Sequence, residues 1–320
     1  MPKKRVANLY ETILLIREVE NYIVEAYPTD IIKSPVHLSI GQEWIAAAIC
    51  EDLSSSDYIS NTYRGHATYI AKGGDLNAMI AELHGKAGGC GGGKAGSMHL
   101  IDIKNGVLGC SAVVGTTIPV ASGWALAQKW SGQKSPDELN IVVTVFGDGA
   151  TEEGAFAESL NFAALHKLPQ VFICENNKLA IHQPLSKRWA RPDLVSRTNS
   201  YGIPSHKVTS GDTLELSDLM ADIYMKVRTP GFGPAFVEVE AYRWLEHVGI
   251  TDDHDQTYRN KDDGIIQRQN DQLDMLASQL SEKTLLDIQK NVETIIKTAI
   301  KFAEDSPFPD KSDLLTFNYA

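Results

Sequence analysis

Two polar residues carry side-chain oxygen atoms at points where apolar runs end. Asp148 lies between two glycines in Gly147-Asp148-Gly149, and Asn177 follows about thirty residues later. Carboxylate and carboxamide oxygens suit Mg²⁺, which prefers oxygen ligands and commonly completes its coordination shell with water and substrate phosphates. Together the two residues predict a site for a magnesium-bound diphosphate. Either motif alone fits an ordinary turn equally well, with Asp148 in a strand-to-helix turn and Asn177 in an asparagine-rich loop.

The segments around these residues predict how they come together. Residues 141–146 form a continuous apolar and β-branched run, which is typical of a strand buried on both faces of a parallel sheet. Residues 170–174 predict a second buried strand. Between them, residues 153–166 carry apolar side chains at helical spacing, and Pro169 follows the end of that predicted helix. A strand, a helix and a second parallel strand place both oxygen-bearing residues at one carboxyl edge, where open α/β sheets bind ligands.

A second polar group follows a short predicted strand that begins at Asp57. It contains Tyr63, Arg64 and His66. A guanidinium offers a planar fork of donors to phosphate oxygens, so this group could bind an anion. Taken alone, the residues fit a surface arginine and a capping histidine at least as well.

The glycine-rich segment 85–99 invites comparison with phosphate-binding loops. From Gly88 the spacing matches G-x-x-x-x-G-K, but Ala95 stands where that motif needs a hydroxyl residue for magnesium. No buried strand is predicted before the segment, although the motif requires one. We therefore predict a loop at an active-site entrance and not a nucleoside triphosphate site.

The composition is that of an ordinary globular protein, with 43% hydrophobic and 22% charged residues. A net charge of -11 opposes binding to a polyanion, so nucleic acid is not an expected partner. No apolar run approaches the roughly 20 residues that span a bilayer, and no signal-peptide core follows the basic N-terminus. We expect a cytoplasmic protein without a membrane partner. The four cysteines lack C-x-x-C spacing, which argues against disulfides and a zinc site.

The remaining segments predict a single domain over residues 1–320, with a central sheet core at about 57–245. Short strands are predicted within 200–208 and at 234–241. Two amphipathic helices at 265–280 and 285–303 make up a C-terminal packing segment at about 262–320. The other helices predicted from apolar spacing span 6–27, 42–53, 76–84, 118–130 and 214–227.

Several motifs occur together in one order, and this order resembles a known family. The motifs, in chain order, are Leu14-Leu15-Ile16-Arg17, His37-Leu38, Gly41-Gln42-Glu43, Tyr63-Arg64 with His66, segment 94–99, the unit from Gly147 to Asn177, Tyr242-Arg243 and segment 306–310. The chain resembles the alpha subunit of the thiamine-diphosphate-dependent dehydrogenase component of 2-oxo acid dehydrogenase complexes, in the pyruvate, branched-chain and acetoin group. The resemblance implies an α/β thiamine-diphosphate-binding fold, in which helices cover both faces of a mostly parallel central sheet.

By this resemblance, the cofactors are thiamine diphosphate and Mg²⁺. The metal ligands would be Asp148, Asn177 and the backbone carbonyl of Leu179. The resemblance also assigns cofactor contacts to a wider set. These are Tyr63 and Arg64 at the diphosphate, backbone groups of Ala112 and Val114 at the aminopyrimidine ring, Gly147 and Gly149 in the signature turn, and Ile181 beneath the bent cofactor.

The resemblance further implies catalytic roles for three histidines. His37 and His66 would lie near the cofactor, and His247 would lie in the active-site channel and assist substrate binding or acyl transfer. A loop histidine with satisfied hydrogen bonds is the alternative for His247. Ala112 stands where many family members have glycine, and segment 244–250 departs from the family's common pattern.

The same resemblance implies partners. In this family a beta subunit supplies the glutamate that activates the aminopyrimidine, so the chain would work in a heterotetramer. It would take a small 2-oxo acid or acetoin and pass the acyl group to a lipoyl-bearing acyltransferase. Two alternatives stay open: a carboligase or split-transketolase subunit that transfers the acyl anion to an aldehyde or sugar, and a nucleotide-binding or purely structural subunit in which Asp148 and Asn177 are turn residues only.

Overall fold

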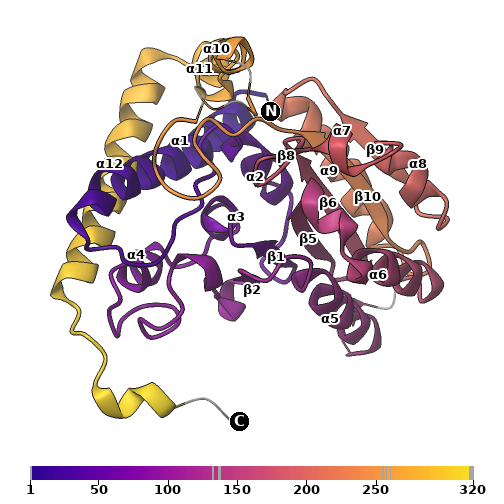
Figure 1. Cartoon of the computed structure of the whole chain (residues 1–320), viewed down its shortest axis with the longest axis horizontal. Coiled ribbons are helices and arrows are strands. Elements are labelled where there is room, and N and C mark those ends of the chain that lie inside the picture. Colours follow the sequence, from indigo (N-terminus) through magenta and orange to yellow (C-terminus); the bar gives the residue numbers. More distant parts are fainter. Residues whose placement is uncertain are drawn as a thin grey trace.

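A six-stranded parallel sheet in the order β2-β1-β5-β6-β10-β9 forms the centre of the molecule (Figure 1). The computed structural model describes residues 2–131, 133–135, 138–253, 256, 258–259 and 261–316. In sheet order, the strands are Val107–Ser111 (β2), Tyr58–Thr62 (β1), Val142–Gly147 (β5), Gln170–Asn176 (β6), Ala235–Glu240 (β10) and Ser205–Val208 (β9). The α/β class and the predicted parallel sheet are confirmed.

The two central strands bring their polar ends to one edge of the sheet. β5 and β6 pair in parallel, with Gly147 opposite Glu175. Nearly all their residues are buried, as their continuous apolar runs predict. Because both strands end at the same level, the residues that follow Gly147 and Asn176 emerge side by side.

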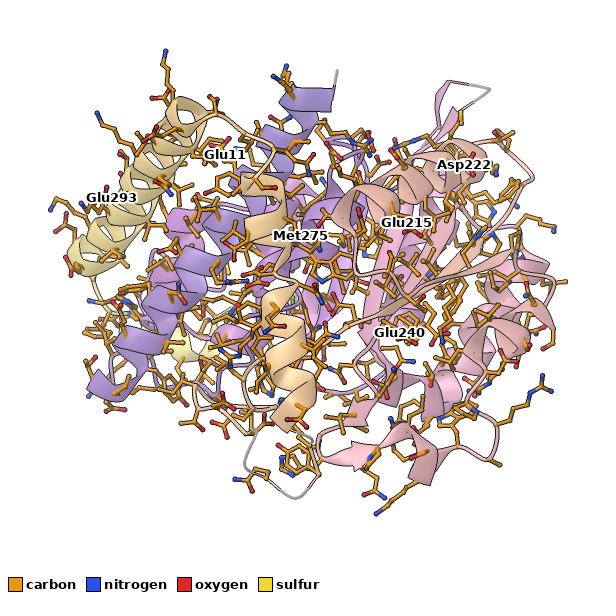
Figure 2. All side chains as sticks on the ribbon, turned by 90° about the horizontal axis from the view of Figure 1, so that it is seen from above. Glu11, Glu215, Asp222, Glu240, Met275 and Glu293 are labelled. Carbon is orange, nitrogen blue, oxygen red and sulfur yellow. The ribbon has the colours of Figure 1, made fainter. Side chains whose placement is uncertain are left out.

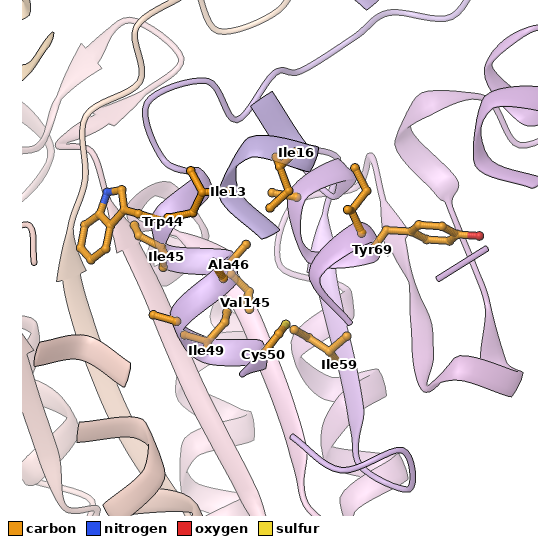
Figure 3. Close-up of a cluster of buried hydrophobic side chains, with 14 of the residues drawn as sticks. Ile13, Ile16, Trp44, Ile45, Ala46, Ile49, Cys50, Ile59, Tyr69 and Val145 are labelled. Carbon is orange, nitrogen blue, oxygen red and sulfur yellow. The ribbon is translucent and has the colours of Figure 1, made fainter. Parts of the chain in front are cut away.

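Helices cover both faces of the sheet. Val143 and Val145 of β5 belong to one apolar core, whereas Val142 and Phe146 belong to another, because successive strand residues point to opposite faces. The first core includes side chains of α1 (Pro2–Ala26), α2 (Glu43–Cys50) and α9 (Thr213–Val227), and the second includes α5 (Thr117–Ser131) and α6 (Gly154–Leu165). Figure 3 shows part of the first core, where labelled side chains come from α1, α2, α3 (His66–Ala71), β1 and β5.

The C-terminal segment packs against the N-terminal part of the chain. One helix is predicted at 265–280, but the structure has two, α10 (Lys261–Gln269) and α11 (Gln272–Ala277), because Asp271 caps α11 by accepting from the Leu273 N–H. The long helix α12 (Glu282–Asp305) lies against α1 and α4 (Leu76–Leu83) (Figure 1). Residues 317–320 of the predicted segment lie outside the described part of the chain.

Some elements carry a weak sequence signal. The predictions do not include β2, whose interior Gly109 has a φ of +129° and lacks the side chain that favours a strand. The strand predicted within 200–208 is confirmed only at Ser205–Val208. The short helices α3 (His66–Ala71), α7 (Leu185–Arg188) and α8 (Leu194–Asn199) are also missed, because so few turns show little periodicity.

Charged side chains are spread around the periphery. Figure 2 shows the labelled Glu293 of α12 and Asp222 of α9 on opposite sides of the molecule. Across the described ranges, no helix is both long and apolar enough to cross a membrane.

Candidate active site

Asp148 lies at the start of a tight turn directly after β5. The turn is the 3-10 helix η4 (Asp148–Glu152), and the Asp148 side chain is only 1% exposed. Its Oδ2 accepts a hydrogen bond from Arg188, whereas its buried Oδ1 has no hydrogen-bond partner among the described residues. Burial raises the pKa of Asp148, and the Arg188 guanidinium opposes that rise. The site therefore contains a buried carboxylate with one oxygen that no described hydrogen-bond donor satisfies.

Asn177 begins the loop that follows β6. Its Nδ2 donates to Gln42 Oε1 at 3.4 Å, and its Oδ1 accepts from the Leu179 N–H at 3.1 Å. The preceding Asn176 has a different role, because its Nδ2 donates to the buried Glu238 carboxylate at 2.7 Å. Of the two neighbouring asparagines, Asn177 is therefore the one that belongs to the site.

A small hairpin carries Leu179 and lies against the Asp148 turn. It pairs β7 (Leu179–Ala180) with β8 (Gln183–Pro184). A Cβ atom added to Gly149 would lie 3.0 Å from the Ala180 Cβ, so the absence of a side chain at Gly149 permits this close approach. The structure thus brings the predicted metal-binding elements together.

Ile181 has an unusual backbone conformation at the tip of this hairpin. Its φ is +54°, in the left-handed region that β-branched residues rarely adopt, and its side chain is 55% exposed. The guanidinium of the buried Arg243 donates to the Ile181 carbonyl at 3.2 Å. Strained backbone of this kind persists where surrounding contacts impose it, often at functional sites. The conformation presents an apolar side chain where the cofactor contact is predicted.

Three rings form a cluster beside the sheet edge. The His37 and Tyr63 ring centroids are 4.3 Å apart, and the His247 ring lies 5.3 Å from His37 and 5.4 Å from Tyr63. Burial and the nearby Arg64 lower the pKa of both histidines to about 3, so both imidazoles are neutral at physiological pH. The buried Nδ1 of His37 has no hydrogen-bond partner within the described ranges. The cluster therefore offers neutral hydrogen-bonding groups.

Arg64 supports this cluster from behind. Its guanidinium donates to the Leu38 carbonyl at 2.5 Å and to the His247 carbonyl at 3.1 Å. It is 6% exposed, and burial lowers its pKa. These two contacts fix the backbone beside His37 and His247, while the predicted contact with a diphosphate remains a prediction.

His66 lies deeper than His37. Its Nε2 is 2.8 Å from Ser97 Oγ, and its Nδ1 is 3.4 Å from a Glu20 carboxylate oxygen. The side chains of His66 and Glu20 are completely buried, and Glu20 also accepts from the Ser39 N–H. This arrangement supports a structural role, and the catalytic role of His66 remains a prediction.

The loop after β2 borders the site with apolar side chains. It contains Ala112 and Val114, and Val113 and Val114 are 63% and 40% exposed. The Val113 N–H donates to Ser111 Oγ at 3.1 Å, which fixes the start of the loop. The predicted backbone contacts of Ala112 and Val114 with a cofactor ring remain predictions.

Glu82 explains the shape of the glycine-rich segment. Its buried carboxylate accepts hydrogen bonds from four backbone N–H groups, at 2.7–2.9 Å; the donors are Gly91, Gly93, Ala95 and Gly96. A phosphate-binding loop would direct such N–H groups at its ligand. Here a side chain of the same chain takes them, in agreement with the sequence-based argument against a triphosphate site.

Sequence reasoning missed several residues that shape the site. Gln42 bridges two site residues, because it accepts from Asn177 and its Nε2 donates to the Glu175 carboxylate at 3.3 Å. Burial raises the pKa of Glu175 to about 7. Arg188, which pairs with Asp148 and Glu152, follows the site in a basic stretch. The only signal in the sequence is the charge of that stretch, which does not distinguish Arg188 from Lys187.

The donor set fits Mg²⁺ better than a transition metal. In the part of the chain that the structure describes, no group of three or more His, Cys, Asp or Glu residues could hold a metal ion. Mg²⁺ needs few protein ligands when substrate phosphates and water complete its octahedron. The open Oδ1 of Asp148, with Asn177 and the Leu179 backbone nearby, provides oxygen donors of the required kind.

A cavity of about 640 Å³ adjoins the hairpin on its other side. Asn177 and Leu179 line it together with Tyr242, Trp244 and residues of α10. Arg17 and Arg268 lie 4.5 Å and 5.1 Å from the Trp244 ring. The cavity therefore connects the predicted metal ligands to the segment that departs from the family pattern.

Comparisons with known proteins identify the family of the chain. Residues 11–312 match the family described as "Dehydrogenase E1 component". The chain is 36% identical over 316 residues to the alpha subunit of acetoin:2,6-dichlorophenolindophenol oxidoreductase from Bacillus subtilis (strain 168), and the match covers 97% of this chain and 92% of that one. It is 33% identical over 323 residues to the pyruvate dehydrogenase E1 component subunit alpha of Rickettsia felis, with 99% and 96% covered.

A solved structure shares the fold. A transketolase from Campylobacter jejuni superposes with a TM-score of 0.54 at 16% identity, over 74% of this chain and 38% of that chain. Our chain thus spans about two fifths of that transketolase, and the likeness concerns the fold alone. The long sequence matches are more specific. They establish that this chain belongs to the dehydrogenase E1 component family.

Proposed function

We propose that the chain is the alpha subunit of a thiamine-diphosphate- and Mg²⁺-dependent dehydrogenase that acts on a small 2-oxo acid or acetoin. One observation carries the proposal: Asp148 has a buried, unpartnered oxygen beside the Asn177 loop, in a chain that belongs to the E1 family. Thiamine diphosphate, when bound, supplies a carbon nucleophile and an electron sink for removing a carboxyl or acyl group. The protein supplies position and charge.

Individual residues hold the cofactor in this proposal. Asp148, Asn177 and the Leu179 carbonyl bind Mg²⁺, and the ion neutralises the diphosphate. Tyr63 and Arg64, which follow β1, would bind the same diphosphate. Ala112 and Val114 would contact the aminopyrimidine through their backbones, and the Ile181 side chain would pack against the cofactor.

The two neutral histidines act on the substrate. Because the pKa values of His37 and His247 are lowered to about 3, neither imidazole adds charge to the site near pH 7. Each can donate one hydrogen bond and accept another. We assign both to hydrogen bonding with the substrate, and His247 also to assisting acyl transfer.

The partner in this proposal is a beta subunit that closes the site. Apolar side chains of four residues around the site are exposed in this chain: Val113, Val114, Ile181 and Val248. A partner that covers them would exclude water and supply the glutamate that activates the aminopyrimidine. The heterotetramer, the lipoyl-bearing acyltransferase as acyl acceptor, the single-domain organisation and the cytoplasmic location belong to the same proposal.

The test is turnover of a panel of 2-oxo acids and acetoin with an artificial electron acceptor. The chain is co-produced with its beta-type partner, and thiamine diphosphate and Mg²⁺ are added. We expect turnover that needs both subunits and is lost in Asp148→Ala. A stable complex that binds the cofactor but oxidises none of these compounds would contradict the dehydrogenase and favour carboligation.

A further inference from the structure

Arg188 connects the two elements that carry the predicted metal ligands. Its Nε donates to the Gln183 carbonyl of the β7–β8 hairpin at 3.0 Å, and its two terminal nitrogens donate to Asp148 Oδ2 and Glu152 Oε1. All three guanidinium nitrogens are used, and the side chain is 7% exposed. One side chain thus joins the acidic turn to the hairpin.

The two oxygens of Asp148 differ because of this contact. Oδ2 is taken by Arg188, while Oδ1 is buried and without a hydrogen-bond partner among the described residues. A carboxylate with one oxygen fixed can rotate little, so the direction of the other oxygen is also fixed. The contact between Arg188 and Oδ2 therefore fixes the direction of Oδ1, which remains able to accept a ligand.

Neighbouring side chains hold Arg188 in place. Glu152 Oε1 also accepts from the Trp189 indole N–H at 3.1 Å. The Arg197 guanidinium lies 4.5 Å from the Trp189 ring and donates to the Thr151 carbonyl at 2.8 Å. The segment from Arg188, at the end of α7, to Arg197 is thus attached to the η4 turn at several points.

We propose that Arg188 is a positioning residue for the metal site: it binds Oδ2 of Asp148 and sets the distance between the acidic turn and the hairpin, so that Oδ1 of Asp148 faces the cation. This inference rests on the proposed function, because it concerns how the chain receives Mg²⁺ and the diphosphate. Partners of metal-binding side chains commonly orient the ligand and tune its affinity.

A competing role for Arg188 predicts the opposite change in Mg²⁺ affinity. If Arg188 were a competitor that occupies the cation's place, its removal would strengthen Mg²⁺ binding. If it positions Asp148, its removal weakens binding, and lysine at the same position restores part of the affinity because the positive charge remains.

The experiment measures the Mg²⁺ concentration needed for thiamine diphosphate to bind the complex of this chain with its beta-type partner, by calorimetry. We compare wild type with Arg188→Gln, Arg188→Lys and the control Arg191→Gln, whose side chain is 80% exposed and pairs with Asp193. We expect Arg188→Gln to weaken apparent Mg²⁺ affinity by about 10- to 100-fold, Arg188→Lys to weaken it less, and Arg191→Gln to match wild type.

A second readout needs neither cofactor nor turnover. Hydrogen exchange of backbone amides in residues 179–187 should accelerate in Arg188→Gln and less in Arg188→Lys, since the hairpin loses its link to the turn. Unchanged Mg²⁺ affinity in both variants, or tighter binding in Arg188→Gln, would overturn the proposal. If wild type itself shows no Mg²⁺-dependent cofactor binding, the proposed function fails and this inference fails with it.

Discussion

Two histidines of the site are held neutral by their surroundings. Burial lowers the pKa of His37 and His247 from 6.5 to about 3, and Arg64 contributes to both shifts. The unfolded chain therefore takes up protons at these residues before the folded chain does as the pH falls. Their contribution to stability is complete above about pH 6.5 and is lost progressively toward pH 3.

We predict a measurable pH dependence of folding from this effect. The free energy of unfolding, measured with urea, should fall between pH 7 and pH 5, by at most about 1.4 kcal/mol per pH unit for each histidine. Partial exposure of His247 reduces that limit for this residue. His37→Gln should show a shallower fall than wild type. Equal slopes in the two proteins would contradict a depressed pKa at His37.

Ile181 should show a conflict between stability and function. Ile181→Gly removes the cost of a left-handed β-branched residue, and its 55% exposed side chain loses little burial. We expect the free energy of unfolding to rise by about 1 kcal/mol and turnover to fall about 100-fold, because the cofactor loses its support.

A control separates the two effects of Ile181→Gly. Lys167 also has a positive φ, at +50°, but it follows α6 away from the site. Lys167→Gly should gain similar stability and keep full turnover. Loss of stability in Ile181→Gly would show that the backbone at this position is not strained.

At the residue scale, the sequence predicts residues whose type and position after a strand indicate a site, but not residues defined only by their contacts in the folded chain. Asp148 and Asn177 were predictable because oxygen donors follow two buried strands. The contact of Arg188 with Asp148 was not predictable, because only the folded structure distinguishes Arg188 from the neighbouring basic residues Lys187 and Arg191. For His66, the sequence could not show that Glu20 and Ser97 surround the ring.

At the scale of elements, Glu82 organises the glycine-rich loop. We predict that Glu82→Gln destabilises the protein by about 2–4 kcal/mol, since the amide group of glutamine faces backbone N–H groups that need an acceptor. Urea unfolding would measure the loss, and hydrogen exchange should increase at residues 91–96. The control is Glu215→Gln on α9. Equal stability of Glu82→Gln and wild type would contradict the role of this carboxylate.

The predictability of each element followed from its burial. β5 and β6 lie in the middle of the sheet and are buried on both faces, so their apolar runs were clear. The edge strand β9 has only one fully buried residue, Val208, and its predicted bounds were less accurate. The break between α10 and α11 depends on one capping contact of Asp271, which apolar spacing does not report.

At the scale of the whole molecule, the exposed apolar side chains around the site imply a partner. We predict that Val113→Glu weakens association with the beta-type subunit by about 3 kcal/mol, or roughly 100-fold in Kd, because a charge would be buried without a partner. Met225→Glu is the matched control, because Met225 is 66% exposed and lies on α9. The buried side chains of α9 belong to the first core, which also contains those of α1 and α2. Equal loss of association in both variants would place the interface elsewhere.

The surface that binds a partner subunit is the feature least predictable from the sequence of one chain. The parallel strands and their carboxyl edge follow from local patterns of one chain, and so do the proposed metal ligands. A surface that binds a partner consists of the same residue types as other exposed apolar positions. Only the folded chain shows that the side chains of Val113, Val114 and Ile181 are left exposed.

We propose that Asp148 holds the cation that binds the cofactor diphosphate. The most direct measurement is binding of thiamine diphosphate to the complex with and without Mg²⁺, for wild type, Asp148→Asn and the control Glu158→Gln, which removes the same charge from an exposed position on α6. We predict Mg²⁺-dependent binding in wild type and Glu158→Gln, and binding weakened at least about 100-fold in Asp148→Asn. If Asp148→Asn binds thiamine diphosphate with wild-type affinity and wild-type Mg²⁺ dependence, Asp148 does not hold the cation.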